Sequence, residues 1–324
     1  MVFFIMLNRN EIFKPKVAIV LATYNGDKYI IEQLDSLFKQ IDIEFSLYCS
    51  DDSSTDKSYQ IIKMYESKVA NIICCKNSGN PGPASNFLNA LRLTSDEDYV
   101  IFCDQDDVWL SNKISSLVVF AIDKLKPDVP GLAYCDAFIV NEDLKTSKIK
   151  MYGDKHIAPK DIDELLYLNG GVQGASMIIN KPMIIEMLSY NKYIYMHDQL
   201  ATYLAVLNKN IYYLNQPLML YRQHSNNVIG RNISFRKKII LLYNSYLIDS
   251  RSWQFVNEFC TVYNTKYNCL ENKSVRYFLS MNKDQKKMFV MECIFGTAVL
   301  HGSRFKLLTK MLVKLLCDKI IPKK

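Results

Sequence analysis

The sequence predicts an α/β fold in which a mostly parallel sheet is flanked by helices. Between residues 16 and 126, strand-like apolar runs alternate four times with helix-like segments, the pattern of parallel strands joined by right-handed crossovers. Polar clusters follow three of the predicted strands, at residues 23–27, 51–54 and 104–107. Ligands of such sheets bind outside the carboxyl ends of the strands. The clusters therefore predict a ligand site at one edge of the sheet.

The first strand is predicted over residues 16–22, where the run Lys-Val-Ala-Ile-Val-Leu-Ala is nearly all apolar, as in a strand buried on both faces. A polar turn follows at residues 23–27. The next helix is predicted over residues 29–40, because its apolar residues recur at helical spacing. These apolar residues are Ile30, Ile31, Leu34, Leu37 and Phe38.

The second strand is predicted from alternating apolar residues at positions 45, 47 and 49, and it leads into the run Ser-Asp-Asp-Ser-Ser-Thr-Asp at residues 50–56. The hydroxyl side chains of that run are favourable N-caps for a helix that continues to about residue 67. A third strand at residues 70–76 leads through a loop rich in Gly and Pro to a helix at residues 84–93. The order of strand, loop and helix is thus repeated.

The fourth strand begins at Tyr99 and ends in three carboxylates within four positions, Asp104, Asp106 and Asp107. Like charges crowded at the end of a buried strand cost free energy unless a cation or hydrogen-bond donors lie beside them. Oxygen ligands of this kind suit Mg²⁺ or Mn²⁺ better than zinc. The alternative interpretation is a solvated acidic turn that caps the following helix, which is predicted over residues 112–126.

Beyond Pro127 the alternation is less regular. Strands are predicted over residues 132–140, 175–179, 211–214 and 218–221, with helices that begin near Pro182 and near His197. After Gly230 the pattern is helical to the end of the chain. Neither G-x-G-x-x-G nor G-x-x-x-x-G-K-[ST] occurs in the sequence, so neither a dinucleotide fingerprint nor a P-loop is predicted.

The composition is that of an ordinary globular chain, with 324 residues of which 49% are hydrophobic and 23% are charged. No apolar run approaches the ~18 residues of a membrane-spanning helix. The apolar patch at residues 2–7 is too short for a signal peptide, so we expect a cytoplasmic protein. The nine cysteines include no C-x-x-C pair, which indicates reduced core residues and not a zinc site or a disulfide framework.

The net charge of +7 is concentrated in residues 303–324, which hold seven basic side chains and one acid. The rest of the chain is almost neutral, so nucleic acid is not an expected partner. Apolar residues in this tail recur at the spacing i, i+3, i+4 and i+7, namely Leu308, Met311, Leu312 and Leu315. A basic amphipathic helix of this kind predicts peripheral binding to the inner face of the cytoplasmic membrane. The alternatives are a terminal helix packed on the core and a dimer contact.

Together, these segments resemble the family 2 glycosyltransferases with the GT-A fold, especially the bacterial rhamnosyltransferase-like branch that builds capsules and O-antigens. The matching segments occur in the family's order, at residues 17–25, 50–56 and 102–109, at Gly174, and at residues 197–199 and 221–227. The resemblance implies a Rossmann-like GT-A domain over residues 1–230. Its nucleotide-sugar half would be about residues 16–126, its acceptor half residues 127–230, and residues 231–324 would form a helical extension.

The resemblance assigns most polar residues of the first half to the sugar-nucleotide donor. Thr23, Tyr24 and Asp51 match positions that line the base pocket, and Asp104 matches one that faces the ribose. The whole implied donor set is Thr23, Tyr24, Asn25, Asp51, Asp52, Asn86 and Asp104. Asp51, Asp52 and Asn86 also have an ordinary alternative, which is capping or packing at the ends of elements.

In the same resemblance, Asp104-Gln-Asp106 corresponds to the family's DXD motif. Asp106 would bind the divalent cation, Mn²⁺ or Mg²⁺, that carries the donor's diphosphate. His224 matches a position near the diphosphate and this metal; its alternative is a loop histidine with satisfied contacts. A metal in this position would stabilise the charge of the departing nucleoside diphosphate.

Asp198 matches the aspartate that acts as catalytic base in the inverting members, where attack by a sugar hydroxyl needs a base within hydrogen-bond reach. The family's motif more often reads Glu-Asp, whereas His197 precedes the aspartate here. Gly174 and Asp136 would lie on the acceptor side. The alternatives are a helix cap for Asp198 and packing at a strand end for Asp136.

The implied function is inverting, metal-dependent transfer of a hexosyl or deoxyhexosyl group from a UDP- or dTDP-linked sugar to a saccharide hydroxyl, in bacterial surface polysaccharide synthesis. The acceptor would be carried on a polyprenyl lipid. Two alternatives are open. A sugar-nucleotide nucleotidyltransferase usually has a Gly-rich basic loop after the first strand, which residues 23–27 lack. A non-catalytic nucleotide-binding membrane scaffold would not need the clustered acids.

Overall fold

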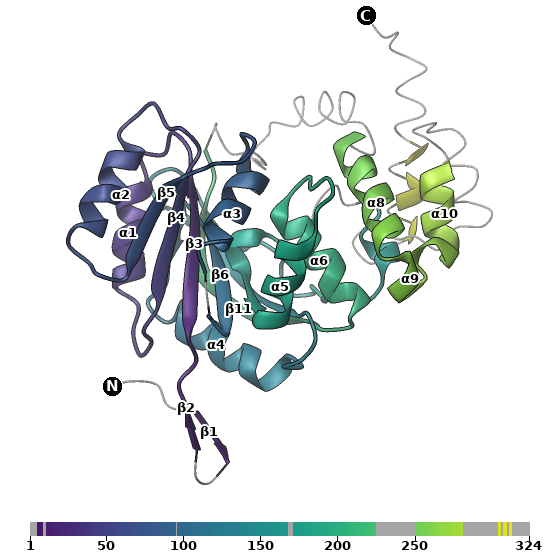
Figure 1. Ribbon diagram of the computed structural model, residues 1–324, viewed down its shortest axis with the longest axis horizontal. Helices are drawn as coiled ribbons and strands as arrows, with labels where there is room; N and C mark the ends of the chain where they lie inside the picture. The colour runs from purple at the N-terminus through teal and green to yellow at the C-terminus, as the bar shows by residue number, and fades with distance from the viewer. Residues whose placement is uncertain are drawn as a thin grey trace, which may run out of the picture. The chain divides into compact units, whose positions relative to one another are not determined.

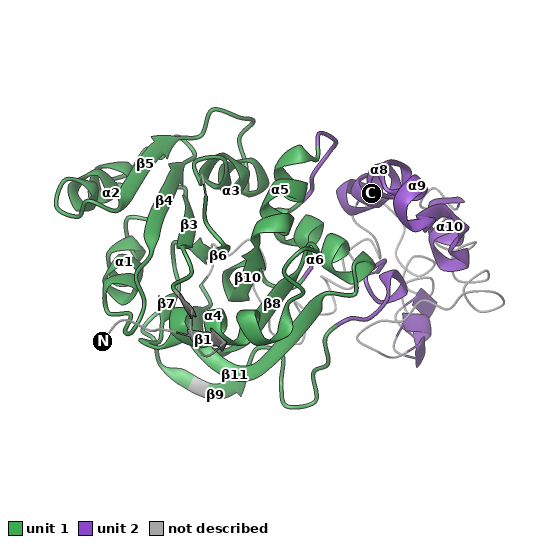
Figure 2. Cartoon of the chain, turned by 60° about the horizontal axis from the view of Figure 1, so that its bottom comes forward, with its two compact units in different colours: residues 1–158, 172–190, 196–228 green, residues 159–171, 191–195, 229–324 purple. Residues whose placement is uncertain are grey.

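The computed structural model describes residues 5–8, 11–94, 96–167, 171–224 and 250–280, together with 304, 305, 307–309, 311 and 312. The chain forms two compact units (Figure 2). Unit 1 comprises residues 1–158, 172–190 and 196–228, and unit 2 comprises residues 159–171, 191–195 and 229–324. Two short segments before residue 200 therefore belong to unit 2.

A nine-stranded sheet forms the centre of unit 1 (Figure 1). Its first half is parallel, in the order β5-β4-β3-β6. These strands are β5 (Ile72–Lys76), β4 (Ser46–Asp51), β3 (Val17–Thr23) and β6 (Tyr99–Asp104). The four strands that the sequence predicts for this half are therefore present and adjacent. β3 and β6 are nearly all apolar because they are buried on both faces.

The second half of the sheet is mixed. It continues through β10 (Met177–Asn180), β8 (Leu132–Val140), β11 (Ile211–Arg222) and β7 (Val108–Trp109), and β9 (Thr146–Lys150) pairs with β8. β10 is antiparallel to both β6 and β8, whereas β11 is parallel to β8. The predicted parallel order thus holds for the first half and gives way to antiparallel pairing beyond β6.

β11 is one strand, although the sequence pattern predicts two pieces at residues 211–214 and 218–221. Its pairing with β8 shifts register on both sides of Pro217. Proline has no backbone N–H to donate, so the ladder is interrupted while the chain keeps its direction. The sequence pattern also does not predict β7, β9 or the hairpin formed by β1 (Ile5–Asn8) and β2 (Glu11–Phe13).

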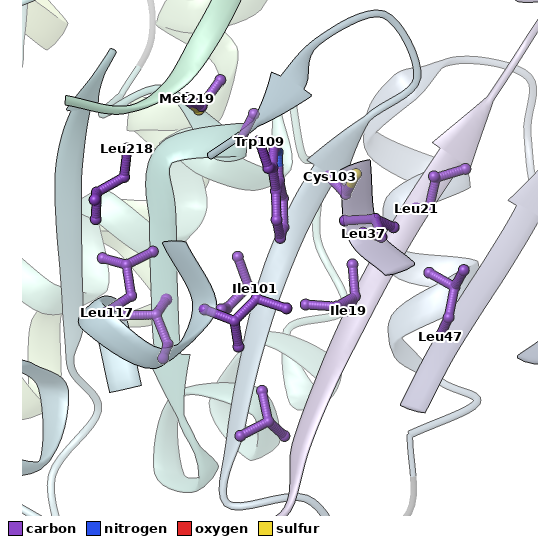
Figure 3. Close-up of a cluster of buried hydrophobic side chains, with 14 of the residues drawn as sticks. Ile19, Leu21, Leu37, Leu47, Ile101, Cys103, Trp109, Leu117, Leu218 and Met219 are labelled. Carbon is purple, nitrogen blue, oxygen red and sulfur yellow. The ribbon is translucent and has the colours of Figure 1, made fainter. Parts of the chain in front are cut away.

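Helices cover both faces of the sheet. α1 (Ile30–Phe38) and α4 (Lys113–Lys124) lie on one face, where Leu37 and Leu117 pack with Ile19 and Ile101 in a buried apolar cluster (Figure 3). Phe102 follows Ile101 and points to the other face. That face is covered by α3 (Pro83–Leu91), α5 (Lys181–Ser189) and α6 (His197–Leu207), and α2 (Ser58–Glu66) lies beside β5.

Unit 2 contains α8 (Ser250–Val262), α9 (Asn264–Tyr267) and α10 (Lys273–Ser280). The buried rings of Phe255 and Phe259 lie 5.4 Å apart. Asn272 Nδ2 donates a hydrogen bond of 2.8 Å to Asp163 Oδ1, which ties the segment 159–171 to this unit. No helix among the described residues is long and apolar enough to cross a membrane.

The predicted amphipathic tail lies mostly outside the described residues. Within it, Leu307 and Met311 are buried, whereas Phe305 and Leu312 are 76% and 43% exposed. Two residues of the predicted apolar stripe thus differ in exposure: Met311 is buried, whereas the Leu312 side chain is partly exposed to solvent.

Candidate functional site

The three predicted polar clusters lie next to one another at the carboxyl ends of adjacent strands. The register of β3 with β4 places Thr23 beside Asp51, and the register of β3 with β6 places Ala22 beside Asp104. The tertiary structure thus brings together the polar groups that the sequence predicts at one edge of the sheet. The polar side chains at this edge form the first part of the candidate site.

Gln105 joins two of these clusters, although sequence reasoning did not single it out. Its Oε1 accepts hydrogen bonds from Thr23 Oγ1 at 2.7 Å and from the Tyr24 N–H at 2.9 Å, and its Nε2 donates to the Tyr24 carbonyl at 3.0 Å. A Cβ at Gly26 would lie 2.2 Å from Gln105 Oε1. Glycine at position 26 therefore leaves room for this clip. The only feature of the sequence that could have pointed to Gln105 is its place between Asp104 and Asp106.

Asp51 and Asn25 close the turns after β4 and β3. The Asp51 carboxylate is almost fully buried and accepts hydrogen bonds from the Ser54 N–H at 2.9 Å and the Ser54 hydroxyl at 2.6 Å, a contact of the N-cap type. Asn25 has a left-handed backbone with φ of 47°, and its Oδ1 accepts from the Thr55 N–H at 2.8 Å. These contacts agree with the capping alternative, and they also fix the shape of the edge.

Asp52 fixes the loop before α3, and Asn86 ties α3 to the end of β3. Asp52 accepts hydrogen bonds from Asn77 Nδ2 at 2.8 Å and from the Gly82 N–H at 2.7 Å. Asn86 donates from Nδ2 to the Thr23 carbonyl at 3.0 Å, but its buried Oδ1 has no partner within the described residues. An unpaired buried amide oxygen costs free energy, which a bound ligand or water would relieve.

The acids that follow β6 have different environments. Asp107 is fully buried and accepts a hydrogen bond from the Arg222 N–H at 3.1 Å. Burial raises the pKa of Asp104 to about 7, with further contributions from the negative charges of Asp106 and Asp198. Burial also raises the pKa of Asp107, and the negative charges of Asp106 and Asp104 raise it further. Asp107 is thus an internal group, whereas the Asp106 side chain is 19% exposed.

Asp106 and His224 form the pair best suited to hold a metal ion. Asp106 Oδ2 lies 2.8 Å from His224 Nε2, and the imidazole stacks on Tyr29 with ring centroids 4.8 Å apart. In the described ranges, no group of three or more His, Cys, Asp or Glu side chains surrounds one metal position. Mg²⁺ usually takes one or two carboxylates, and substrate phosphates and waters complete its shell. The pair therefore fits a cation that arrives with a diphosphate.

Arg222 supports this pair from inside the protein, and sequence reasoning missed it because arginines are usually surface residues. It is 2% exposed. Its Nε donates to the Asp106 carbonyl at 2.8 Å, its guanidinium pairs with Glu32, and it lies 4.7 Å from the centroid of the Tyr29 ring. Arg222 thus fixes both the Asp106 backbone and the ring on which His224 stacks.

Asp198 is the second residue of α6 and is close enough to Asp104 for its charge to raise that carboxyl's pKa. Its carboxylate accepts a hydrogen bond of 2.7 Å from the Gln199 N–H, and the Gly174 backbone lies beside the Asp198 side chain. Burial raises the pKa of Asp198 to about 6. Gln173 Nε2 donates to Asp104 Oδ2 at 3.2 Å. The turn at residues 173–174 therefore contacts both Asp104 and Asp198.

His197 is a packing residue. Its ring stacks on Phe87 at a centroid distance of 3.9 Å and meets the edge of Phe102 at 4.7 Å. Burial lowers its pKa to about 3, and neither ring nitrogen has a hydrogen-bond partner in the part of the chain that the structure describes. A Cβ at Gly174 would lie 2.6 Å from His197 Nε2. The imidazole therefore acts as a neutral spacer against the turn.

Asp136 is a buried residue of β8 whose carboxylate links this strand to Tyr152 and to Tyr213 of β11. Its Oδ1 accepts hydrogen bonds from the N–H groups of Ala137 at 2.8 Å and Tyr152 at 3.1 Å, and its Oδ2 accepts from the Tyr213 hydroxyl at 2.6 Å. Both carboxylate oxygens are engaged and the side chain is fully buried. These contacts correspond to the packing alternative for this residue.

A GT-A-like sheet with acids at its carboxyl edge defines a class of protein, and comparison with known proteins identifies the family. The family model described as Glycosyl transferase family 2 matches residues 18–160. The chain is 34% identical over 230 residues to the dTDP-rhamnosyl transferase RfbG of Shigella flexneri, which covers 67% of this chain and 76% of that protein. The chain therefore belongs to glycosyltransferase family 2 and is a glycosyltransferase, which confirms the predicted family.

Other relatives and solved structures agree. The putative teichuronic acid biosynthesis glycosyltransferase TuaG of Bacillus subtilis is 25% identical over 235 residues, 71% of this chain and 88% of that protein. The structure of S. aureus TarS 1–349 with UDP-GlcNAc matches with a TM-score of 0.55 at 20% identity, over 94% of this chain and 92% of that one. A mannosyltransferase from Pyrobaculum calidifontis, in complex with GDP-Man and Mn²⁺, matches with a TM-score of 0.50 at 12% identity, over 96% of this chain and 82% of that one. These structures confirm the GT-A fold.

Proposed function

We propose that this glycosyltransferase transfers a hexosyl or deoxyhexosyl group from a UDP- or dTDP-linked sugar to a saccharide hydroxyl, with inversion, in bacterial surface polysaccharide synthesis. Support comes from RfbG, a dTDP-rhamnosyl transferase, and from TarS, which was solved with UDP-GlcNAc. The observation that carries the proposal is the position of Asp104 at the carboxyl edge, where burial raises its pKa and the charges of Asp106 and Asp198 raise it further. A metal-binding acid and a base thus lie close to the same carboxyl group.

The donor would occupy the edge formed by β3, β4 and β6. Tyr24 is 56% exposed, so its ring is open to a nucleobase, and Thr23 and Tyr24 are held in place by Gln105. Asn25, Asp51, Asp52 and Asn86 shape the loops around this position. We assign Asp104, the last residue of β6 and the neighbour of Ala22 on β3, to the ribose side of the donor, as the family resemblance implies.

Asp106 and His224 would hold Mn²⁺ or Mg²⁺ together with the diphosphate of the donor. The bound ion would supply Lewis-acid stabilisation to the departing nucleoside diphosphate. Arg222 holds the Asp106 backbone, and Tyr29 stacks on both the Arg222 guanidinium and the His224 ring. A site that is already ordered needs less rearrangement when the charged ligand arrives.

Asp198 would accept the proton of the attacking hydroxyl as the sugar moves to the acceptor. The Gln199 N–H orients its carboxylate, and the Gly174 backbone lies beside its side chain. With a pKa of about 6, the group is ionised at neutral pH but is a better base than an ordinary aspartate. Direct displacement inverts the anomeric carbon, whereas retention through a covalent intermediate needs a second acid beside that carbon. Asp107 and Asp136 are fully buried and do not meet that need.

We also propose that residues 1–230 carry the reaction, that residues 231–324 form a helical extension, and that the protein works in the cytoplasm at the inner membrane face. Support is the net charge of the tail, where residues 303–324 hold seven basic side chains and one acid. Anionic lipid headgroups attract such segments. From the inner membrane face, the enzyme would reach an acceptor that is carried on a polyprenyl lipid.

The proposal is tested by adding UDP- and dTDP-sugars to the full-length protein, each with and without Mn²⁺ or Mg²⁺. A selective donor should raise the melting temperature only when the metal is present. The selected donor is then incubated with lipid-linked and soluble saccharide acceptors, and NMR of the product reports the anomeric configuration. A product that retains the donor's configuration would overturn the inverting mechanism. Metal-independent transfer would overturn the role of the cation.

A further inference from the structure

Lys113 is the first residue of α4, and its side chain is fully buried. Its Nζ donates a hydrogen bond of 2.6 Å to the Ala175 carbonyl, lies 3.2 Å from Met219 Sδ, and sits 3.5 Å from the centroid of the Trp109 ring. Figure 3 shows Trp109 and Met219 within the apolar cluster that receives it. The ammonium thus contacts β7, β11 and the 3₁₀ turn at Gly174–Ser176 (η2).

This placement costs stability in two ways. A buried ammonium loses several kcal/mol of hydration, and a positive charge at a helix N-terminus opposes the helix dipole. Burial accordingly lowers the pKa of Lys113 to about 8. Within the described ranges, no carboxylate lies within 4.0 Å of its Nζ, and the partners are a carbonyl, a thioether and an aromatic ring. Stability alone therefore does not explain a lysine here.

The bond to Ala175 leads directly to the site. Ala175 follows Gly174, whose backbone lies beside the Asp198 side chain, and Gln173 of the same turn donates a hydrogen bond to Asp104. The turn has little room to move toward α6, because a Cβ at Gly174 would lie 2.6 Å from His197 and 3.5 Å from the Asp198 Cβ. The lysine holds the turn from one side while α6 limits it on the other.

We propose that Lys113 is a positioning residue, whose buried ammonium holds the turn at residues 173–176 so that the Gly174 backbone stays packed beside the Asp198 side chain. The inference rests on the proposed role of Asp198 as the base. Lys113 itself contacts neither donor nor acceptor. Misplacement of the base by about 1 Å costs on the order of 10²-fold in rate, so the effect of losing Lys113 should appear in kcat.

The test compares wild type with Lys113→Met, which keeps the length and removes the charge and the donor. The matched control is Lys124→Met, at the other end of α4, where the lysine is exposed and paired with Asp123. We expect Lys113→Met to melt at the wild-type temperature or above, because an apolar replacement of a buried charge is often neutral or stabilising. Its kcat should fall about 10- to 100-fold, with the donor's KM changed less than threefold.

Hydrogen exchange gives a readout that does not depend on activity. The peptide that spans residues 171–180 should exchange faster in Lys113→Met than in wild type and in Lys124→Met. Unchanged exchange, or an unchanged kcat in a folded variant, would overturn the positioning role. If Lys113→Met does not fold, Lys113→Leu, which also removes both the charge and the donor, is measured in the same way. If Lys113→Met exchanges faster but the wild-type protein transfers no sugar, the proposed function fails, while the finding that Lys113 holds the turn stands.

Discussion

His224 Nε2 lies 2.8 Å from Asp106 Oδ2, although 118 residues separate them in the chain. Asp106 lies two residues after the end of β6, and His224 lies two residues after the end of β11. β7, which follows Asp107, pairs with β11. The pairing of β7 with β11 therefore places the segment after β6 next to the segment after β11, so that Asp106 and His224 meet. This pair is the part of the site that we assign to the metal.

The first prediction concerns Asp106. Asp106→Asn should abolish measurable transfer and remove the rise in melting temperature that donor and metal produce together, because the amide is a poor ligand for a hard cation. The fold should survive, since Asp106 contributes its carbonyl, and not its side chain, to Arg222. Asp123→Asn, on the exposed side of α4, is the control. Full activity of Asp106→Asn in excess EDTA would contradict the assignment.

The second prediction concerns Asp198. Asp198→Asn should lower kcat by about 10²- to 10⁴-fold, the range for loss of a general base. The donor should bind with nearly unchanged affinity in the thermal-shift assay, because Asp198 is assigned to the acceptor side. A variant with wild-type turnover, or one that loses donor binding while its turnover persists, would remove Asp198 from this role.

The third prediction concerns pH. The base acts in its ionised form, and burial raises the pKa of Asp198 to about 6. Turnover should therefore be low below pH 6, rise with pH through this value and level off above it. The measurement is kcat against pH at saturating donor, metal and acceptor, with melting temperatures at each pH to exclude unfolding. A profile that levels off near pH 4, the value for an ordinary aspartate, would argue against a buried base.

The fourth prediction concerns the close contact between Gly174 and His197. Gly174→Ala should destabilise the protein by about 1–3 kcal/mol, because a Cβ would lie 2.6 Å from a ring that is itself packed between Phe87 and Phe102. The same substitution in a His197→Ala background should cost less, since the ring that it meets is gone. Denaturant unfolding of the four proteins of this cycle measures the coupling. Equal costs in both backgrounds would show that the contact is not the cause.

The fifth prediction concerns the tail. Replacing Lys319, Lys323 and Lys324 with glutamine should weaken binding to anionic liposomes at low salt and leave activity on a soluble acceptor unchanged. Each lysine near such a surface contributes about 1 kcal/mol. Substitution is preferable to deletion, because Leu307 and Met311 are buried. A wild-type protein that ignores anionic liposomes would favour the core-packed alternative.

The sequence alone determined the family, the presence of the first four strands and the edge at which the polar clusters meet. Each of these depends on local information. Apolar runs such as residues 17–22 are buried on both faces, and in a parallel sheet the residues after each strand meet at one edge. The aspartates at positions 104, 106 and 198 could be selected because they stand in recognisable motifs.

Tertiary structure alone decided which partners these residues have. The clip formed by Gln105, the buried guanidinium of Arg222 and the buried ammonium of Lys113 each join segments that are remote in the chain. Arginine and lysine are expected at the surface, so no local pattern marks the ones that fold inward. Their charged groups are met by carbonyls, aromatic rings and an acid, most of which come from parts of the chain remote in sequence. That convergence depends on strand order and register, which a linear pattern does not contain.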